Sequence, residues 1–158
     1  MIKRIFFILS FSIIYQSSIA QGLTLDILIE LRPKSISELD KALIQRNYEL
    51  ESAINKDDIN QTIYKAKSKA YRESITLHNY KGRDNFITYF YKSSKIELNL
   101  LTQIKNKKGK LIKEDVTPDG SIRYVYKTAN YVFFIAKDKT ISTLTIYTIK
   151  DYNLYYKI

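Results

Sequence analysis

The pattern of polar and apolar positions in this chain predicts the same order of elements twice. From about residue 35 and again from about residue 94, apolar side chains recur at the spacing of one helix face. Each helical stretch is followed by four short runs rich in β-branched and aromatic residues, and turn residues separate these runs. We therefore predict two tandem helix-plus-four-strand units, at residues 35–92 and 94–150.

Capping residues mark the start of both predicted helices. Ser35 and Glu38 have the spacing of a capping box. In this motif the serine side chain accepts a hydrogen bond from a backbone amide inside the helix, and the glutamate reaches back to the serine amide. Ser94 and Glu97 repeat the spacing in the second unit, so we expect both helices to begin in the same way.

The ends of the predicted helices and of the chain carry further signals. Asn47 and Gly109 stand where each helix is expected to end in the left-handed conformation. Before the first unit, the apolar residues of 23–31 fit either a helix or a strand, and we favour a short helix because Pro33 ends the segment. We expect residues 152–158 to form either an extension of the last strand or a frayed tail.

Turn residues separate the predicted strands, and the strongest turn signal is the segment 117–120. Its proline presets the turn and its glycine supplies positive φ. Two groups of strands, each preceded by a helix, predict an α+β fold with one antiparallel sheet of seven to eight strands and helices packed on one face. The predicted strands are residues 48–54, 60–67, 72–80 and 85–92, then 110–116, 121–127, 130–137 and 141–149.

The two units share a few residues at offsets of 61 to 62 positions. Such sparse identity fits either an internal duplication or chance. The order of elements is the same under both interpretations. The matching pairs are Leu43 and Ile104, Leu50 and Leu111, and Tyr64 and Tyr126.

The first twenty residues have the features of a signal peptide. Lys3 and Arg4 precede an apolar run at 5–15, and small residues precede an expected cut after Ala20. The apolar run is shorter than the roughly 20 residues that a membrane-spanning helix needs. We expect residues 1–20 to be removed and 21–158 to form a single mature α+β domain without a transmembrane segment, located in the periplasm or secreted from a bacterium.

Composition narrows the partners that such a protein can have. The chain has no cysteine, so it forms no disulfides, which favours a bacterial envelope over a eukaryotic secretory route. Its formal net charge of +10 attracts anionic partners. We expect an acidic protein partner or an envelope ligand, and no nucleic acid because the protein is exported. The sequence does not indicate the oligomeric state.

Groups suited to catalysis are scarce in the sequence. With no cysteine and one histidine, the usual nucleophilic triads and zinc sites lack their components. The glycines are never clustered, so no phosphate-binding loop is present. His78 lies within a predicted strand, and the acidic pairs 57–58 and 114–115 lie at predicted turns. We predict a protein that is not an enzyme and binds no cofactor or metal, unless a pocket gathers Glu114, Asp115 and His78.

Two sets of side chains are candidates for a binding surface. A run of lysines at the end of the second helix could dock an anionic group, although cations there also stabilise the helix terminus. Strand tyrosines would offer a large amphipathic contact area if their face is open, and would be core residues if it lies under the helices. The candidates are Lys105, Lys107, Lys108, Lys110, Lys113, Tyr64, Tyr89 and Tyr91.

The order of elements over residues 23–150 resembles that of the β-lactamase inhibitor protein and related small exported binding proteins, whose repeat is a helical hairpin followed by four strands. Those inhibitors use disulfides that this chain lacks, so the resemblance transfers no functional residue. Residues 35–39, 46–48, 103–105 and 109–111 also look similar to uncharacterised exported proteins of Bacteroidetes. This second resemblance implies a compartment and no activity.

Together these features predict an exported, non-enzymatic protein that binds another protein across the exposed face of its sheet, as an inhibitor or immunity protein does. The alternative is a periplasmic carrier or sensor of an envelope lipid or glycan, because a sheet curved around helices can leave an apolar groove.

Overall fold

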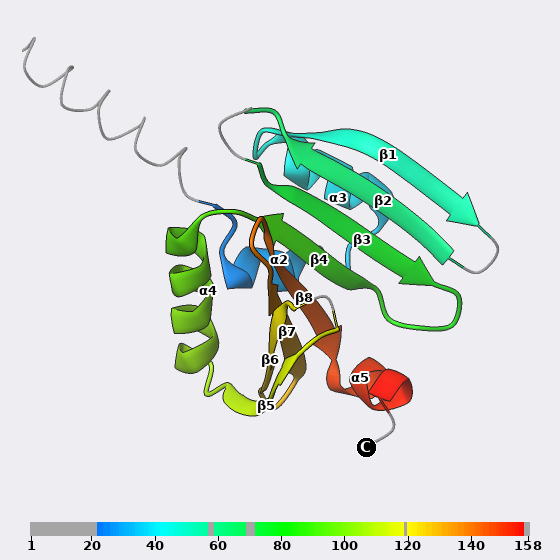
Figure 1. Cartoon of the computed structure of the whole chain (residues 1–158). Helices are drawn as coiled ribbons and strands as arrows, with labels where there is room; N and C mark the ends of the chain where they lie inside the picture. The colour runs from blue at the N-terminus through cyan, green and yellow to red at the C-terminus, as the bar shows by residue number, and fades with distance from the viewer. Residues whose placement is uncertain (1–21, 57–58, 69–71, 119, 157–158) are drawn as a thin grey trace, which may run out of the picture.

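The computed structural model describes residues 22–56, 59–68, 72–118 and 120–156. The predicted signal peptide and the acidic residues at 57, 58 and 119 lie outside these ranges. The described residues confirm the α+β class, with helices packed on one antiparallel sheet (Figure 1).

In the described part of the chain, eight strands form a single sheet in the order β1-β2-β3-β4-β8-β7-β6-β5. Every neighbouring pair is antiparallel. The strand ends differ from the predicted ends by at most two residues. The strands are β1 Tyr48–Lys56, β2 Ile59–Ala66, β3 Ser74–Tyr80, β4 Phe86–Tyr91, β5 Lys110–Val116, β6 Ile122–Lys127, β7 Tyr131–Lys137 and β8 Ser142–Thr148.

The two predicted units meet in the middle of the sheet. Their last strands, β4 and β8, pair with each other, and Tyr89 lies opposite Leu144. The first strand of each unit, β1 or β5, therefore forms an edge of the sheet.

Both edge strands carry an irregularity at the corresponding position. The register of β1 shifts between Leu50 and Ser52, and the register of β5 shifts between Leu111 and Lys113. A bulge of this kind bends an edge strand and makes pairing with another chain more difficult. The matched bulges fit the predicted repeat, and its origin by duplication stays a prediction.

The predicted helices are present, and a further helix follows β8. The described helices are α2 Leu25–Leu31, α3 Ile36–Ile44, α4 Ser94–Asn106 and α5 Ile149–Tyr156. Among the described residues, no helix combines the length and the apolar character needed to cross a membrane.

One of the two predicted capping boxes forms. The amide of Ser35 donates to Glu38 Oε2 at 3.0 Å, and the amide of Glu38 donates to Ser35 Oγ at 3.4 Å. The second prediction is wrong, because Ser94 is already the first residue of α4. The carboxylate of Glu97 instead accepts hydrogen bonds from Lys137 and Ser142, which ties α4 to β7 and β8.

One of the two predicted left-handed helix ends is confirmed. Asn47 has a φ of 62°, as expected after α3. After α4 the left-handed residue is Lys108, with a φ of 59°, and the prediction for Gly109 is wrong. Gly109 is needed for a different reason: a Cβ there would lie 2.5 Å from Cγ2 and 2.8 Å from the carbonyl oxygen of Ile104.

The main core lies between the sheet and the helices α2, α3 and α4. We call this side of the sheet the helix face. Leucines of α2 and α3 pack there against apolar and aromatic side chains from the central strands. Fully buried members include Leu28, Leu31, Leu39, Leu43, Tyr64, Ile87, Phe133 and Ile146.

Helix α5 lies on the opposite side of the sheet, which we call the outer face. Its Tyr152 packs against Val132 and Phe134 in a second, smaller core. The expectation of a strand extension or a frayed tail is therefore wrong for the segment up to Tyr156. The helix begins after Thr148, whose hydroxyl accepts from the amide of Asp151 at 3.2 Å, a local cap that the sequence analysis missed.

Candidate functional site

The candidate tyrosines do not belong to a binding surface. Tyr64, Tyr89 and Tyr91 lie on the helix face, and each is at most 1% exposed. That part of the predicted surface is wrong, because α2, α3 and α4 cover this face of the sheet. Burial raises the pKa of Tyr64 to about 12, with a smaller contribution from the charge of Asp40. These tyrosines are core residues.

The candidate lysines are exposed, at the end of α4 and on β5. Lys107 forms an ion pair with Asp26 at 2.5 Å, and Lys113 forms one with Asp115 at 3.1 Å. Exposed pairs of this kind contribute little to stability. Because β5 is an edge strand, the lysines lie far across the sheet from β1. The remaining candidates, Lys105, Lys108 and Lys110, share this edge.

The structure does not gather the candidate acids with the histidine. Asp115 lies on β5 and His78 on β3, with four strands between them. Asp115 is instead held by Arg123, whose Nε and Nη2 donate to its two oxygens at 2.9 and 2.5 Å. These hydrogen bonds, with help from Lys113, lower the pKa of Asp115 to about 2. A bidentate pair of this geometry links β5 to β6.

His78 belongs to a polar network that crosses the outer face. Its Nδ1 lies 3.2 Å from Nε2 of Gln61, and its Nε2 lies 3.3 Å from the hydroxyl of Thr88. The Thr88 hydroxyl lies 3.1 Å from that of Thr145. Since a glutamine amide nitrogen can only donate, Nδ1 accepts and the neutral imidazole carries its proton on Nε2. The network therefore connects β2, β3, β4 and β8.

The environment keeps His78 neutral. Its ring stacks on Phe86 with 4.3 Å between the ring centroids and 10° between the ring planes. Burial lowers the pKa of His78 to about 4. At neutral pH this histidine therefore contributes a flat ring and two hydrogen-bonding atoms, without a charge.

An aromatic row continues from Phe86, the ring on which His78 stacks, in both directions along the outer face. Tyr80 stacks on Phe86 at 5.5 Å, and Phe86 lies 4.8 Å from Tyr147. Beyond Tyr147 the row runs through Phe134 to Tyr156 of α5, at 5.4 and 5.0 Å. One end of this row is thus covered by α5, which packs against β7 and β8.

The other end of the row lies on strands that none of the described helices covers on this side. Figure 1 shows α3 behind β1 and β2, with no described helix in front of them. Ile54 lies opposite Gln61, and Ile59 lies opposite Tyr80. Directly opposed residues of antiparallel strands lie on the same face, so both isoleucines extend the row. They are 47% and 38% exposed.

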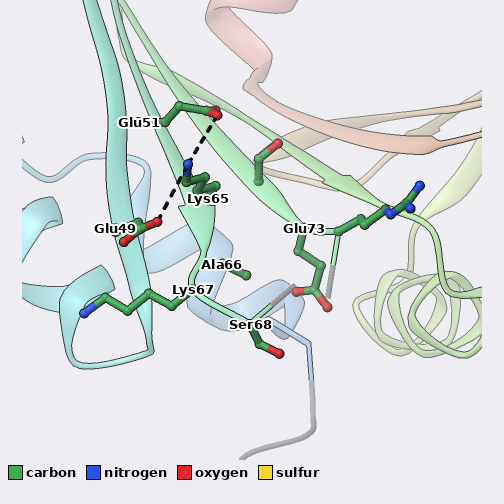
Figure 2. A pocket seen from close by; sticks show the side chains of 9 residues that line it. Glu49, Glu51, Lys65, Ala66, Lys67, Ser68 and Glu73 are labelled. Carbon is green, nitrogen blue, oxygen red and sulfur yellow. Dashed lines mark ion pairs between the residues drawn. The ribbon is translucent and has the colours of Figure 1, made fainter. Parts of the chain in front are cut away.

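A cavity of about 580 Å³ lies where β2 ends and β3 begins (Figure 2). Charged side chains dominate its lining. In the figure, Lys65 lies between Glu49 and Glu51, and their ion pairs measure 3.7 and 3.9 Å. The other charged residues that line it are Lys67, Arg72 and Glu73.

Glu73 is the functional candidate that the sequence analysis missed. It is only 7% exposed, and its Oε2 accepts hydrogen bonds from the hydroxyls of Tyr48 at 2.8 Å and Tyr89 at 2.5 Å. Burial, and the neighbouring charge of Glu73, raise the pKa of both tyrosines far above the usual value. The sequence around Glu73 has no pattern that marks a buried acid, because the contact joins three strands far apart in the chain.

The described residues contain no cluster of three or more histidine, cysteine or acidic side chains that could hold a metal ion. In comparisons with known proteins, no family model, no curated protein and no solved structure matches this chain.

Proposed function

We propose that the protein is exported and that it binds another protein on the outer face of β1–β4, without catalysing a reaction. The main support for this proposal is the aromatic row of the outer face. The row continues from beneath α5 onto strands that the described helices leave uncovered.

The chemistry of this surface suits a protein partner. Tyr80 and His78 present flat, half-buried rings, while Ile54 and Ile59 add exposed apolar area. Aromatic rings of this kind bury much area with little loss of side-chain entropy, and they are enriched at protein interfaces. The hydroxyl of Thr88 and the amide of Gln61 lie among them and can hydrogen-bond to a partner. A continuous apolar patch edged by polar groups is typical of an interaction site.

The charge of the chain favours an acidic partner. The formal net charge of the full chain is +10, and it becomes +8 when Lys3 and Arg4 leave with residues 1–20. Such a field raises the rate at which an anionic protein associates. The lysines at the β5 edge lie far from the uncovered part of the outer face. We therefore assign them to long-range attraction and place the direct contacts on β1–β4.

The alternative is a carrier or sensor of an envelope lipid or glycan, and its lipid form has less support. Between the sheet and the helices α2–α4, the side chains form a buried core. The cavity at the β2–β3 end is lined mainly by charged residues, which do not suit a hydrocarbon chain.

Site-specific photo-crosslinking in the source organism tests the proposal. A crosslinking residue at position 59 lies on the uncovered outer face, and one at position 98 is the matched control, because Leu98 is an apolar side chain of α4 that is 68% exposed. We expect a discrete protein adduct from position 59 and none from position 98. The absence of an adduct at position 59, or the same adduct from both positions, would contradict the proposal.

Export is tested separately by fractionation and N-terminal sequencing. We expect the protein in the envelope or the medium, with Gln21 as its first residue. Protein in the cytoplasm that retains residues 1–20 would contradict the export part of the proposal.

A further inference from the structure

The start of β5 carries a dense group of lysines. Residues 105–113 contain five lysines and no acidic residue. Helix α4 leads into β5 through a tight turn, in which the amide of Lys108 donates to the carbonyl oxygen of Lys105 at 2.8 Å (Figure 1). On the neighbouring strand, Lys127 lies directly opposite Lys110. The fold thus brings these cations together at the edge of the sheet that β5 forms.

Four of the lysines at this edge have no counter-charge within the described chain. Lys107 and Lys113 each form an ion pair, whereas the other four form none with a described acidic residue. Like charges in directly opposed strand positions repel each other, so the opposed pair at the start of β5 does not stabilise the sheet. An anionic surface outside the chain would relieve this repulsion. We call the four exposed residues the lysine cluster: Lys105, Lys108, Lys110 and Lys127.

Exposed aliphatic side chains lie directly beside the lysine cluster. Leu111 is 49% exposed and Ile112 is 45% exposed, and both follow Lys110 on the edge strand. Ile112 falls within the register shift of β5, so it has no directly opposed residue on β6. Cations beside exposed aliphatic groups suit an anionic lipid surface, where the cations meet the head groups and the aliphatic groups enter the boundary with the acyl chains.

Other occupants use only part of this surface. The bulge between Leu111 and Lys113 hinders the addition of a strand from another chain. A second copy would also bring its own lysines to the same edge. A soluble polyanion would contact the lysine cluster and leave Leu111 and Ile112 in water. An anionic bilayer contacts both the cations and the aliphatic side chains.

We propose that the lysine cluster, together with Leu111 and Ile112, binds the surface of an anionic lipid bilayer. This role is additional to the long-range attraction of a protein partner. Strand β1 forms the opposite edge of the sheet, so lipid binding at β5 uses none of the residues that we place in the protein-binding surface. The lipid proposal and the protein-binding proposal can therefore fail separately.

Sedimentation with lipid vesicles tests the lipid proposal. The protein is expressed in the source organism and purified from it, so that it carries its natural N-terminus. It is mixed with vesicles of phosphatidylcholine alone or of an equal mixture of phosphatidylcholine and phosphatidylglycerol. We expect binding to the anionic vesicles to be about 10-fold tighter or more, and to weaken as the salt concentration rises.

A pair of double variants tests the role of the cations. Lys110→Gln with Lys127→Gln removes two members of the lysine cluster, and we expect it to weaken binding to the anionic vesicles about 10-fold or more. The matched control is Lys95→Gln with Lys139→Gln. It removes the same charge from two exposed residues, one in the first turn of α4 and one in the turn after β7, and should change the affinity about twofold or less.

A pair of single variants tests the aliphatic contact. Ile112→Gln should weaken binding to the anionic vesicles about threefold or more, because a polar side chain gains less on entering the lipid boundary. Leu154→Gln on α5 is the control, since Leu154 is 55% exposed and lies away from β5. It should leave the affinity unchanged. All the substituted residues are exposed, so the variants should fold, and urea unfolding checks that they do.

Four results would overturn the lipid proposal. The first is no binding to the anionic vesicles, and the second is equal binding to both kinds of vesicle. The third is an equal loss of affinity in the two lysine double variants, which would mean that only the net charge matters. The fourth is unchanged affinity of Ile112→Gln, which would mean that the edge binds anionic groups in general.

Discussion

The hydroxyl of Tyr89 lies 2.5 Å from Oε2 of Glu73, and both groups are buried beneath the helices. Tyr48 donates to the same oxygen, so one carboxylate joins β1, the start of β3 and β4. Tyr91, two residues after Tyr89 on the same face, has a buried hydroxyl without a partner among the described residues. These two tyrosines form a matched pair in one strand.

Replacing Tyr89 with phenylalanine should lower the free energy of unfolding by about 1–3 kcal/mol, because a buried carboxylate loses one of its two donors. Tyr91→Phe should leave the free energy unchanged or raise it, since it removes a polar atom that makes no described hydrogen bond. Urea unfolding of both variants measures the difference. Equal destabilisation by the two substitutions would show that the Glu73 contact adds nothing.

His78 should make the protein less stable in mild acid. Its pKa in the folded protein is about 4, below the ordinary value of 6.5. Between these pH values the unfolded chain binds more protons than the folded one, so stability falls as the pH drops through this window. We expect a loss of about 1–3 kcal/mol from this residue. Urea unfolding at several pH values measures the loss.

The control for this prediction is His78→Gln, which cannot titrate. Carboxylates with a lowered pKa, such as Asp115 at about 2, remain ionised in the folded state through the same window and lose their contribution at lower pH. The difference between wild type and variant therefore isolates the histidine. A wild type and a variant with the same pH dependence would contradict the neutral, buried state of His78.

The sequence predicted the strands and the first three helices well, because their signals are local. Alternating side chains, turn residues and the capping box at Ser35 each act over a few residues. The left-handed residue predicted after α4 was Gly109, whereas the structure has it at Lys108, one position earlier. Position 109 requires glycine because Ile104 lies too close for a Cβ atom. The local preference for glycine at helix ends does not reveal this contact.

The site was less predictable for a physical reason. Whether a strand tyrosine is core or surface depends on which face the helices cover, and Tyr64, Tyr89 and Tyr91 point to the covered one. Alternation in the sequence shows that two faces exist without showing which is open. The contact between Glu73 and Tyr48 spans 25 positions, so no short motif could reveal it.

Helix α5 should be needed to cover its part of the outer face. Tyr152 is 4% exposed and contacts Phe134, so Tyr152→Ala should destabilise the protein by about 3–5 kcal/mol. Leu154→Ala is the control in the same helix, because Leu154 is 55% exposed, and it should change stability by about 0.5 kcal/mol or less. Thermal or urea unfolding distinguishes them. A small effect of Tyr152→Ala would mean that α5 does not pack as described.

The pair between Asp115 and Arg123 should be visible by titration. The pKa of Asp115 is about 2, chiefly because Arg123 donates two hydrogen bonds to its carboxylate. In Arg123→Gln, we expect the pKa of Asp115 to rise toward the ordinary value for aspartate. Carbon-detected NMR of the carboxyl group measures the change. An unchanged pKa of Asp115 in the variant would show that a group other than Arg123 lowers it.

The central claim is that the protein binds another protein on the outer face of β1–β4. The affinity for the crosslinked partner tests this claim most directly. The partner obtained from position 59 is purified and its dissociation constant is measured for the wild type, Ile59→Glu and Leu98→Glu. We predict that Ile59→Glu weakens binding about 10-fold or more, while Leu98→Glu leaves it within about twofold. Unchanged affinity with Ile59→Glu, or an equal loss with Leu98→Glu, would contradict the claim.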